Sequence, residues 1–406
     1  MTMISVGEAL DRILAAFEPL APEEVSLGQA LGRVLARDVA ARRTQPPVAV
    51  SAMDGYAARG ADVATVPAVL RLIGAAPAGA AYPGTVGPGE TVRIFTGGPV
   101  PEGADTVVMQ EDTEAEGDRV TVNEAAKAGQ FVRAAGLDFQ EGVVGLEAGA
   151  VLNARDIGLA AAMNHPWLSV RRQPRVAILA TGDEIVMPGD PVGVNQIVSA
   201  NSLALAAFVA ACGGVPINLG IAPDRTDALR AMAAGARGTD LLVTTGGVSV
   251  GEHDLVREAL GAQGLEVDFW RIAMRPGKPL MFGRLGPVPV MGVPGNPVSA
   301  LVCCLIFLRP ALGRMLGLAP DRGPPSTARL AAPLEANDRR QDYLRARLFR
   351  DDHGRLCTEA FAPQDSSMIS LLAWADCLIL RAPDAASAEV GAEVEIVMFP
   401  PGLPGV

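Results

Sequence analysis

The chain has 406 residues with 34 basic and 45 acidic side chains, and its composition is 49% hydrophobic and 19% charged. This composition excludes a disordered chain, and at roughly 150 residues per domain the length allows two to four domains. The formal net charge of −11 argues against nucleic acid and against an anionic membrane surface as partners, because both repel an acidic protein.

The cysteine and hydropathy patterns predict a soluble cytoplasmic protein. The five cysteines form no CxxC pair and no metal-like spacing, so we expect small apolar residues in a reducing compartment. Three histidines, far apart in the chain, argue against a histidine-rich zinc site. The opening residues show no basic-plus-apolar signal pattern. The longest apolar run, Val298–Leu308, is about eleven residues, too short to span a bilayer, and predicts a core helix.

The first part of the chain predicts a helical module that is interrupted by a β domain. Apolar residues at helical spacing from Val6 to Phe17 predict a helix. From Thr44 to about Gly136 the pattern changes to short alternating runs broken by Gly and Pro, which predict a small all-β module. A helical pattern returns over 153–163, so the β module is expected to be an insertion.

The rest of the chain predicts an α/β domain followed by a β module. Four short apolar runs lack alternation, as expected for strands buried on both faces: Val176–Ala180, Ile217–Ile221, Leu241–Thr244 and Val288–Val293. Helical segments separate several of them, which predicts three layers around a mainly parallel sheet. Asp321–Pro325 is interpreted as a linker, and alternating runs such as Tyr343–Phe349 predict a C-terminal β-barrel or sandwich.

The predicted fold class is therefore a multidomain α/β plus β protein. In chain order we predict an N-terminal, elongated helical linker domain over 1–44 and 137–172, an inserted β domain over 45–136, an α/β domain with a mainly parallel sheet over 173–320, and a C-terminal β-barrel over 326–406.

Three loops follow predicted strands of the α/β domain, where an open parallel sheet places its ligands. They are Thr181–Glu184, Thr244–Asp254 and Pro294–Ser299. The second reads TTGGVSVGEHD, and its glycines allow backbone N–H groups to approach a phosphate or another oxyanion. Asp254 stands where a helix would begin, so a capping role and a metal or substrate contact are equally supported.

Arg275 and Lys278 flank a Pro-Gly turn just before an apolar run. An isolated pair of this kind is more often a solvated turn. In a chain of net charge −11 with an oxyanion cradle on the same domain, the pair favours a bound anion. Two loops of the β module, SAMDGYA around Asp54 and FTGGPVP around Thr96, are interpreted either as ordinary turns or as contact surfaces, and composition leaves both readings open.

Together these segments resemble the molybdopterin molybdenumtransferase family, which includes the C-terminal enzyme domain of gephyrin. The matching stretches are SAMDGYA from Ser51, FTGGPVPEGADTVVMQED from Phe95, TGDEIV from Thr181, TTGGVSVGEHD from Thr244, RPGKP from Arg275 and GVPGNPVSA from Gly292. They occur in order and cover about residues 50 to 300. Many relatives carry Lys where Arg275 stands, which excludes a role that needs a neutral amine at this position.

The resemblance implies the last step of molybdenum cofactor assembly: molybdate enters the dithiolene of adenylylated molybdopterin, AMP is released, and Mg²⁺ is required. It implies a homodimer whose cleft joins the α/β domain of one subunit to the β domain of the other, with transient contacts to other enzymes of the same biosynthesis. The implied catalytic acids are Asp54, Glu184, Asp254, Asp138 and Asp224, of which Asp54, Glu184 and Asp254 would also bind the metal. The implied substrate contacts are Thr96, Thr181, Gly246, Gly247, Ser249, Gly251, Arg275, Lys278, Gly295 and Asn296.

Two alternatives remain open at this point. One is a molybdopterin adenylyltransferase or a nucleotide hydrolase, because the α/β module also occurs in such enzymes. The other is a scaffold without enzymatic activity that binds partner peptides through its β module. In the C-terminal module Arg345 and the pair Ser366 and Ser367 are interpreted as β-surface residues more readily than as ligand contacts.

Overall fold

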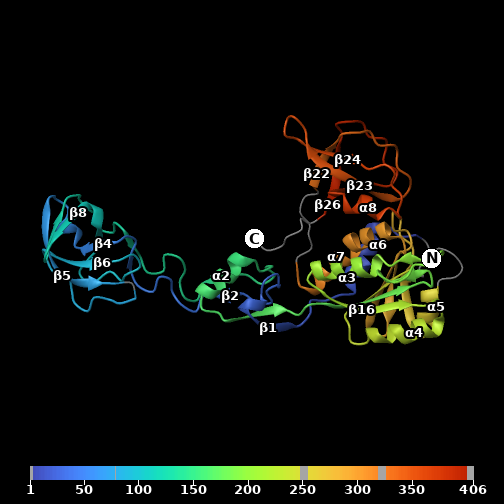
Figure 1. The fold of residues 1–406 in the computed structure, drawn as a ribbon, viewed down its shortest axis with the longest axis horizontal. Helices are drawn as coiled ribbons and strands as arrows, with labels where there is room; N and C mark the ends of the chain where they lie inside the picture. The colour runs from blue at the N-terminus through green and yellow to red at the C-terminus, as the bar shows by residue number, and fades with distance from the viewer. Residues whose placement is uncertain (1–2, 78, 247–254, 319–325, 400–406) are drawn as a thin grey trace.

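The computed structural model describes residues 3–77, 79–246, 255–318 and 326–399. The molecule is elongated, and its chain forms bodies of different architecture along the long axis (Figure 1). A small β domain lies at one end and the α/β domain at the other, with a narrow connecting region between them and the C-terminal barrel beside the α/β domain. The chain is thus a multidomain α/β protein.

The β domain at the far end is built on one six-stranded sheet. Its strand order is β7-β4-β6-β5-β9-β8, and all neighbours are antiparallel except β5 and β6. The strands are β4 (Gly55–Ala58), β5 (Ala68–Ala76), β6 (Glu90–Ile94), β7 (Thr106–Met109), β8 (Thr113–Glu116) and β9 (Arg119–Val122). Val92, Ile94 and Val107 are fully buried in its core. The predicted all-β module is confirmed.

The connecting region pairs chain segments from before and after the β domain. The antiparallel pairs are β1 (Pro22–Ser26) with β12 (Trp167–Arg171), β2 (Val39–Ala40) with β11 (Val144–Leu146), and β3 (Val50–Ser51) with β10 (Val132–Arg133). Helix α2 (Ala154–Ala162) begins at a capping box between Asn153 and Asp156. The helical character expected of this linker is therefore not confirmed, because it consists of short strand pairs and loops together with helix α2.

The α/β domain contains a second six-stranded sheet, in the order β16-β13-β17-β21-β20-β18. Its strands are β13 (Arg175–Thr181), β16 (Val215–Ala222), β17 (Leu241–Thr245), β18 (Leu265–Phe269), β20 (Met281–Leu285) and β21 (Val288–Val293). The first four strands in this order are parallel to one another. β20 is antiparallel to its neighbour β21, and β18 is antiparallel to β20. Because the four predicted strands carry apolar residues on both faces, each face needs a covering layer.

Helices supply both layers. They are α3 (Asn201–Ala211), α4 (Thr226–Ala233), α5 (Leu255–Gly261), α6 (Pro297–Cys303) and α7 (Arg309–Met315), with a π-helical stretch at Cys304–Leu308 joining the last two. One core cluster contains Ile178 and Val243 with α3 and α6, and the other contains Leu179 and Leu242 with α4 and α5. The prediction of three layers around a mainly parallel sheet is confirmed.

The continuous helix Pro297–Met315 is long and apolar enough to cross a membrane by length and composition alone, with a mean hydropathy of 1.6. Of the most apolar 18-residue stretch of this helix, 67% is buried inside the protein. It packs in the same core cluster as the sheet. It is therefore the core helix that the apolar run predicted.

The N-terminal helix belongs to the α/β core and not to the linker. Helix α1 (Val6–Ala15) is capped by Ser5, and its Ile13 side chain is fully buried among α/β residues. The Phe17 ring, just beyond the helix, lies 6.3 Å from the Phe282 ring of β20. A helix over these residues was predicted correctly, but its assignment to a linker domain is wrong because its apolar face packs on the large sheet.

The C-terminal module is a closed barrel of five strands. They are β22 (Ser326–Leu330), β23 (Gln341–Arg350), β24 (Leu356–Ala360), β25 (Cys377–Arg381) and β26 (Glu393–Met398). The barrel closes because β23 pairs with both β24 and β25. β19 (Met274–Arg275) of the α/β domain also pairs with β23, and helix α8 (Ile369–Ala373) contacts α6. The barrel is thus joined to the α/β domain on two sides.

Substituting Ile13→Ala should destabilise the α/β domain by about 2–5 kcal/mol, because the change leaves a cavity in the main core. Hydrogen exchange of strands β17 and β21 over a urea series reports this domain directly. Asp11→Ala, on the exposed face of the same helix, should change the free energy of unfolding by less than about 0.5 kcal/mol. Equal effects of the two substitutions would contradict the placement of α1 in the core.

Candidate active site

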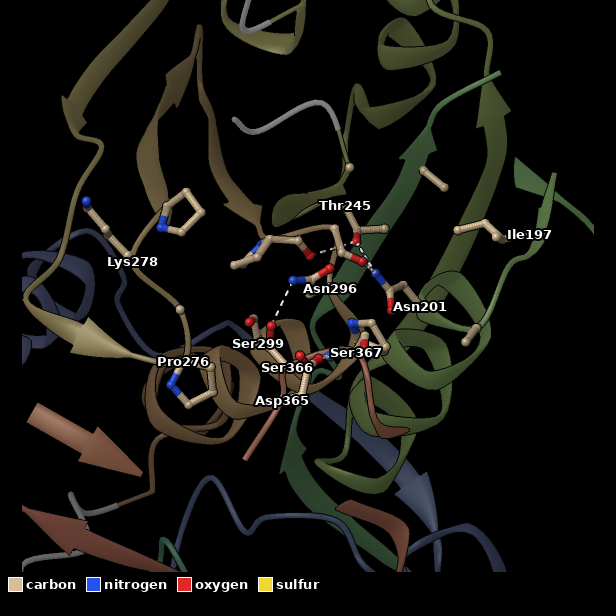
Figure 2. A pocket seen from close by; sticks show the side chains of 18 of the residues that line it. Ile197, Asn201, Thr245, Pro276, Lys278, Asn296, Ser299, Asp365, Ser366 and Ser367 are labelled. Atoms are coloured by element: carbon tan, nitrogen blue, oxygen red, sulfur yellow. Dashed lines mark hydrogen bonds between the residues drawn. The ribbon is translucent and has the colours of Figure 1, made fainter. Parts of the chain in front are cut away.

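A cavity of about 890 Å³ opens at the carboxyl ends of β13, β17 and β21 (Figure 2). Parallel strands end at the same edge of the sheet, so the loops that follow them converge there. Glu184 follows β13, Gly246 follows β17, and Gly295 and Asn296 follow β21. Lys278 lies on the opposite wall. The three predicted loops therefore meet at one pocket, as far as the structure describes them.

The β14 and β15 ribbon, Ile185–Val186 paired with Ile197–Val198, forms a further wall of the pocket. The backbone N–H of Ile197 donates to the Glu184 carbonyl at 2.7 Å. This bond anchors the ribbon directly beside the Glu184 side chain. The Glu184 carboxylate also stands over Gly182, where a Cβ would come within 2.5 Å of it. Gly182 has a φ of +139°, a backbone conformation that favours glycine.

Gly246 makes the closest approach between two of the site loops. A Cβ on Gly246 would lie 2.4 Å from the Thr181 carbonyl oxygen, and Gly246 has a φ of +85°. The Thr181 side chain is buried behind it rather than lining the cavity, and its hydroxyl has no hydrogen-bond partner among the described residues. Thr181 thus supports the wall, and its predicted contact with substrate stays a prediction.

Asn201, at the start of α3, joins two of the strand-end loops. Its side-chain N–H groups donate to the Thr245 hydroxyl at 2.8 Å and to the Gly295 carbonyl at 2.7 Å (Figure 2). The Thr245 hydroxyl lies 3.3 Å from the Pro294 carbonyl. These bonds fix the spacing between the ends of β17 and β21. Sequence reasoning missed Asn201, whose only signal was an amide residue opening a helix.

The C-terminal barrel forms the remaining rim. The Asn296 side-chain amide donates to the Ser366 hydroxyl at 2.8 Å, and Asp365 and Ser367 also line the cavity (Figure 2). Buried Arg345 holds this loop from beneath, donating to the Gln364 side chain at 3.2 Å and to the Met368 carbonyl at 3.0 Å. Ser366 is therefore a pocket residue that was interpreted as a surface residue, whereas Arg345 is a buried support.

The two predicted cations differ in their surroundings. Arg275 donates to both carboxylate oxygens of Asp342 on β23, with Nε distances of 2.8 and 2.9 Å, and lies 3.7 Å from Asp338. The Asp342 side chain is only 3% exposed, and this burial raises its pKa while the guanidinium partly offsets the shift. Lys278 makes no ion pair within the described residues. Lys278 is therefore the cation available to a bound anion.

The predicted acids do not all reach the pocket within one chain. Asp224 lies at the neighbouring strand end, where its backbone N–H donates to the Asp183 carboxylate at 3.0 Å, and it does not line the cavity. Asp138 is an exposed residue of the connecting region. Gly247, Ser249, Gly251 and Asp254 lie outside the described residues. Within the described ranges, no group of three or more His, Cys, Asp or Glu side chains could hold a metal ion.

Asp54 and Thr96 form a separate site in the β domain. Asp54 Oδ1 accepts hydrogen bonds from the Thr96 backbone N–H at 2.6 Å and from its hydroxyl at 2.7 Å. The backbone bond, then the hydroxyl bond, and lastly the charge of Arg93 lower the Asp54 pKa. The β domain lies at the opposite end of the molecule from the pocket (Figure 1). One chain therefore keeps Asp54 apart from Glu184.

The Asp54–Thr96 bonds predict a defined pH response. Because the Asp54 pKa lies below its ordinary value, the bonds are fully present above the unfolded pKa of about 3.9 and are lost as the pH falls through the lowered folded pKa. Thr96→Val removes the hydroxyl donor and should raise the Asp54 pKa, as measured by carboxyl ¹³C NMR titration. Thr121→Val on β9 is the control, and an unchanged Asp54 titration in Thr96→Val would refute this account.

Three family models match successive parts of the chain. Residues 4–164 match the MoeA N-terminal region (domain I and II), residues 177–314 match a probable molybdopterin binding domain, and residues 327–399 match the MoeA C-terminal region (domain IV). The match follows the same order along the chain as the connecting region with its β domain, the α/β domain and the barrel.

Relatives and a solved structure agree with this match. A molybdopterin molybdenumtransferase of Nostoc sp. is 39% identical over 79% of this chain and 76% of its own length. One of Haemophilus influenzae is 32% identical over 98% of this chain and 99% of its own. The crystal structure of a molybdopterin biosynthesis MoeA protein from Pyrococcus horikoshii covers 98% of this chain and 99% of its own, with 29% identity and a TM-score of 0.85. The chain therefore belongs to the molybdopterin molybdenumtransferase family of enzymes.

Proposed function

We propose that this enzyme inserts molybdate into adenylylated molybdopterin and releases AMP in a Mg²⁺-dependent reaction. The observation that carries the proposal is the pocket itself, which combines an unpaired cation, a carboxylate and neutral hydrogen-bond donors. Lys278 would attract the anionic groups of the substrates, and Glu184 supplies a hard oxygen ligand. A surface that merely binds peptides has no need for this combination.

The neutral groups of the pocket suit an elongated substrate with several oxygens. Backbone at Gly246 and Gly295 can approach a ligand closely, because neither residue carries a side chain. Ser366 adds a hydroxyl from the barrel side, across from the strand-end loops. Since Asn201 fixes the spacing between the loops, the donors would be in place before the substrate binds, which lowers the cost of ordering them.

The separation of Asp54 from the pocket favours a homodimer. Asp54 and Thr96 are held in a rigid arrangement at one end of the chain, while Glu184 and Lys278 lie at the other. We propose that the pocket of one subunit is completed by the β domain of its partner, so that each active site uses residues of two chains. Two-fold symmetry then gives two identical sites per dimer.

The donor set fits Mg²⁺, which binds oxygen and often takes one or two carboxylates together with substrate phosphate oxygens. Under this proposal Glu184 supplies one carboxylate and Asp54 of the partner subunit supplies another; Asp254 lies outside the described residues. Bound Mg²⁺ would neutralise negative charge on the phosphate oxygens as AMP leaves. An aspartate carboxylate is ionised at neutral pH and is therefore able to bind a cation.

Mixing two inactive variants tests the shared site. Asp54→Asn and Glu184→Gln should each abolish molybdate-dependent AMP release without unfolding the chain. If the variants are unfolded, mixed in equal amounts and refolded, half of the dimers are mixed and each of those contains one intact site. The expected activity is therefore about a quarter of the wild-type value. Refolded wild-type protein is the control.

The same experiment distinguishes the alternatives. No recovery in the mixture, although an affinity tag on one variant co-purifies the other and so shows mixed dimers, would contradict a site shared between subunits. AMP release that ignores molybdate, or consumption of ATP in its absence, would favour an adenylyltransferase or a nucleotide hydrolase. Absence of any turnover by wild-type protein supplied with adenylylated molybdopterin, molybdate and Mg²⁺ would overturn the proposed reaction.

Lys278 gives a second test, because the chain contains only one other lysine, Lys127. Lys278→Ala should weaken the binding of pyrophosphate about tenfold, which corresponds to about 1.4 kcal/mol for the loss of one charge-assisted contact. Isothermal titration calorimetry at low salt measures the effect. Lys127→Ala, an exposed lysine of the β domain, is the matched control, and equal loss in both variants would argue for a non-specific charge effect.

A further inference from the structure

Arg93 occupies a confined place beside the Asp54–Thr96 site. It lies on β6, and its guanidinium carbon is 5.0 Å from the centre of the Tyr56 ring and 5.1 Å from the centre of the Phe95 ring. A guanidinium within about 6 Å of a ring centre gains from the negative face of the ring. The Tyr56 ring of β4 and the Phe95 ring just beyond the end of β6 thus restrict the position of this one side chain.

The hydrogen bonds of Arg93 reach the same segments. One N–H group donates to the Gly55 carbonyl at 3.3 Å, and another donates to the Gln110 side chain. The backbone N–H of Gln110 in turn donates to the Asp54 carbonyl at 3.1 Å. Arg93 therefore contacts the chain neighbour of Asp54 on β4, and it is linked to the Asp54 backbone through Gln110.

Arg93 is also connected to Thr96, because the Phe95 ring that it contacts belongs to the residue directly before Thr96. Arg93 thus ties together the start of β4, the end of β6 and the segment after β7. The Gly55 carbonyl, the two rings and Gln110 all belong to segments that hold Asp54 or Thr96.

We propose that Arg93 is a positioning residue that holds Asp54 and Thr96 in their hydrogen-bonded arrangement. The positioning role itself does not depend on the proposed function. Only the expected effect of Arg93 on turnover rests on it. The planar fork of arginine is needed, because lysine can supply the charge but cannot stack between two rings while donating in two fixed directions. Arg93 is itself turned toward these partners, so it acts through Asp54 and not as a substrate ligand.

The first test needs no substrate. In Arg93→Gln, the Thr96 amide resonance should shift, because the hydrogen bond from this amide to the Asp54 carboxylate is displaced, and Arg93→Lys should restore only part of the change. Arg71→Gln is the matched control, because exposed Arg71 lies on β5 of the same sheet and pairs with Glu90. An unchanged Thr96 amide resonance in folded Arg93→Gln would overturn the proposal.

The second test uses turnover. Arg93→Gln should lower kcat/KM for molybdate-dependent AMP release about tenfold, because misplacing one reacting group is costly, whereas Arg71→Gln should leave it unchanged. If Arg93→Gln fails to fold, Phe95→Leu removes one of the two rings and should shift the Thr96 amide in the same direction. NMR changes in a protein with no turnover at all would support the positioning role while refuting the proposed reaction.

Discussion

The pocket depends on the ion pair between Arg275 and Asp342, which joins the α/β domain to the barrel. Asp342 is almost completely buried, and a buried carboxylate without its partner is strongly unfavourable. The pair therefore fixes where β23 lies against β19, and with it the barrel loop that carries Ser366 into the pocket. Arg275, which was expected to bind a ligand, lines the cavity and also holds its barrel wall in place, whereas Lys278 makes no ion pair within the described residues.

A second constraint is the narrow connecting region, which separates the two halves of the proposed site. Short antiparallel pairs such as β1 with β12 connect the segments on either side of the insertion, so the β domain stands away from the α/β domain. A site divided as proposed would be complete only where a second chain brings its own β domain. Under the proposed function, dimer formation and the assembly of a working site would be one event.

Much of the fold could be predicted because its signals are local. Buried apolar runs gave the strands around Ile178 and Val243, and glycine-rich loops marked the strand ends. The assignment of α1 failed because an amphipathic helix carries no information about which sheet will cover its apolar face. Asn201 was missed and Ser366 was interpreted as a surface residue for a related reason, since their partners Gly295 and Asn296 lie far along the chain. The pairing of Arg275 with Asp342 could not be predicted for the same reason.

The basic side chains of this protein are almost all arginine, and only Lys127 and Lys278 are lysine. Apart from the chain's amino terminus, these two carry the only primary amines, and they lie in different domains, one on an exposed surface and one in the pocket. A primary amine can be deprotonated and can react with acylating reagents, whereas a guanidinium stays charged. Within the pocket, an acylating reagent would therefore react with the Lys278 amine. Binding of a ligand in the pocket could be followed as protection of that amine.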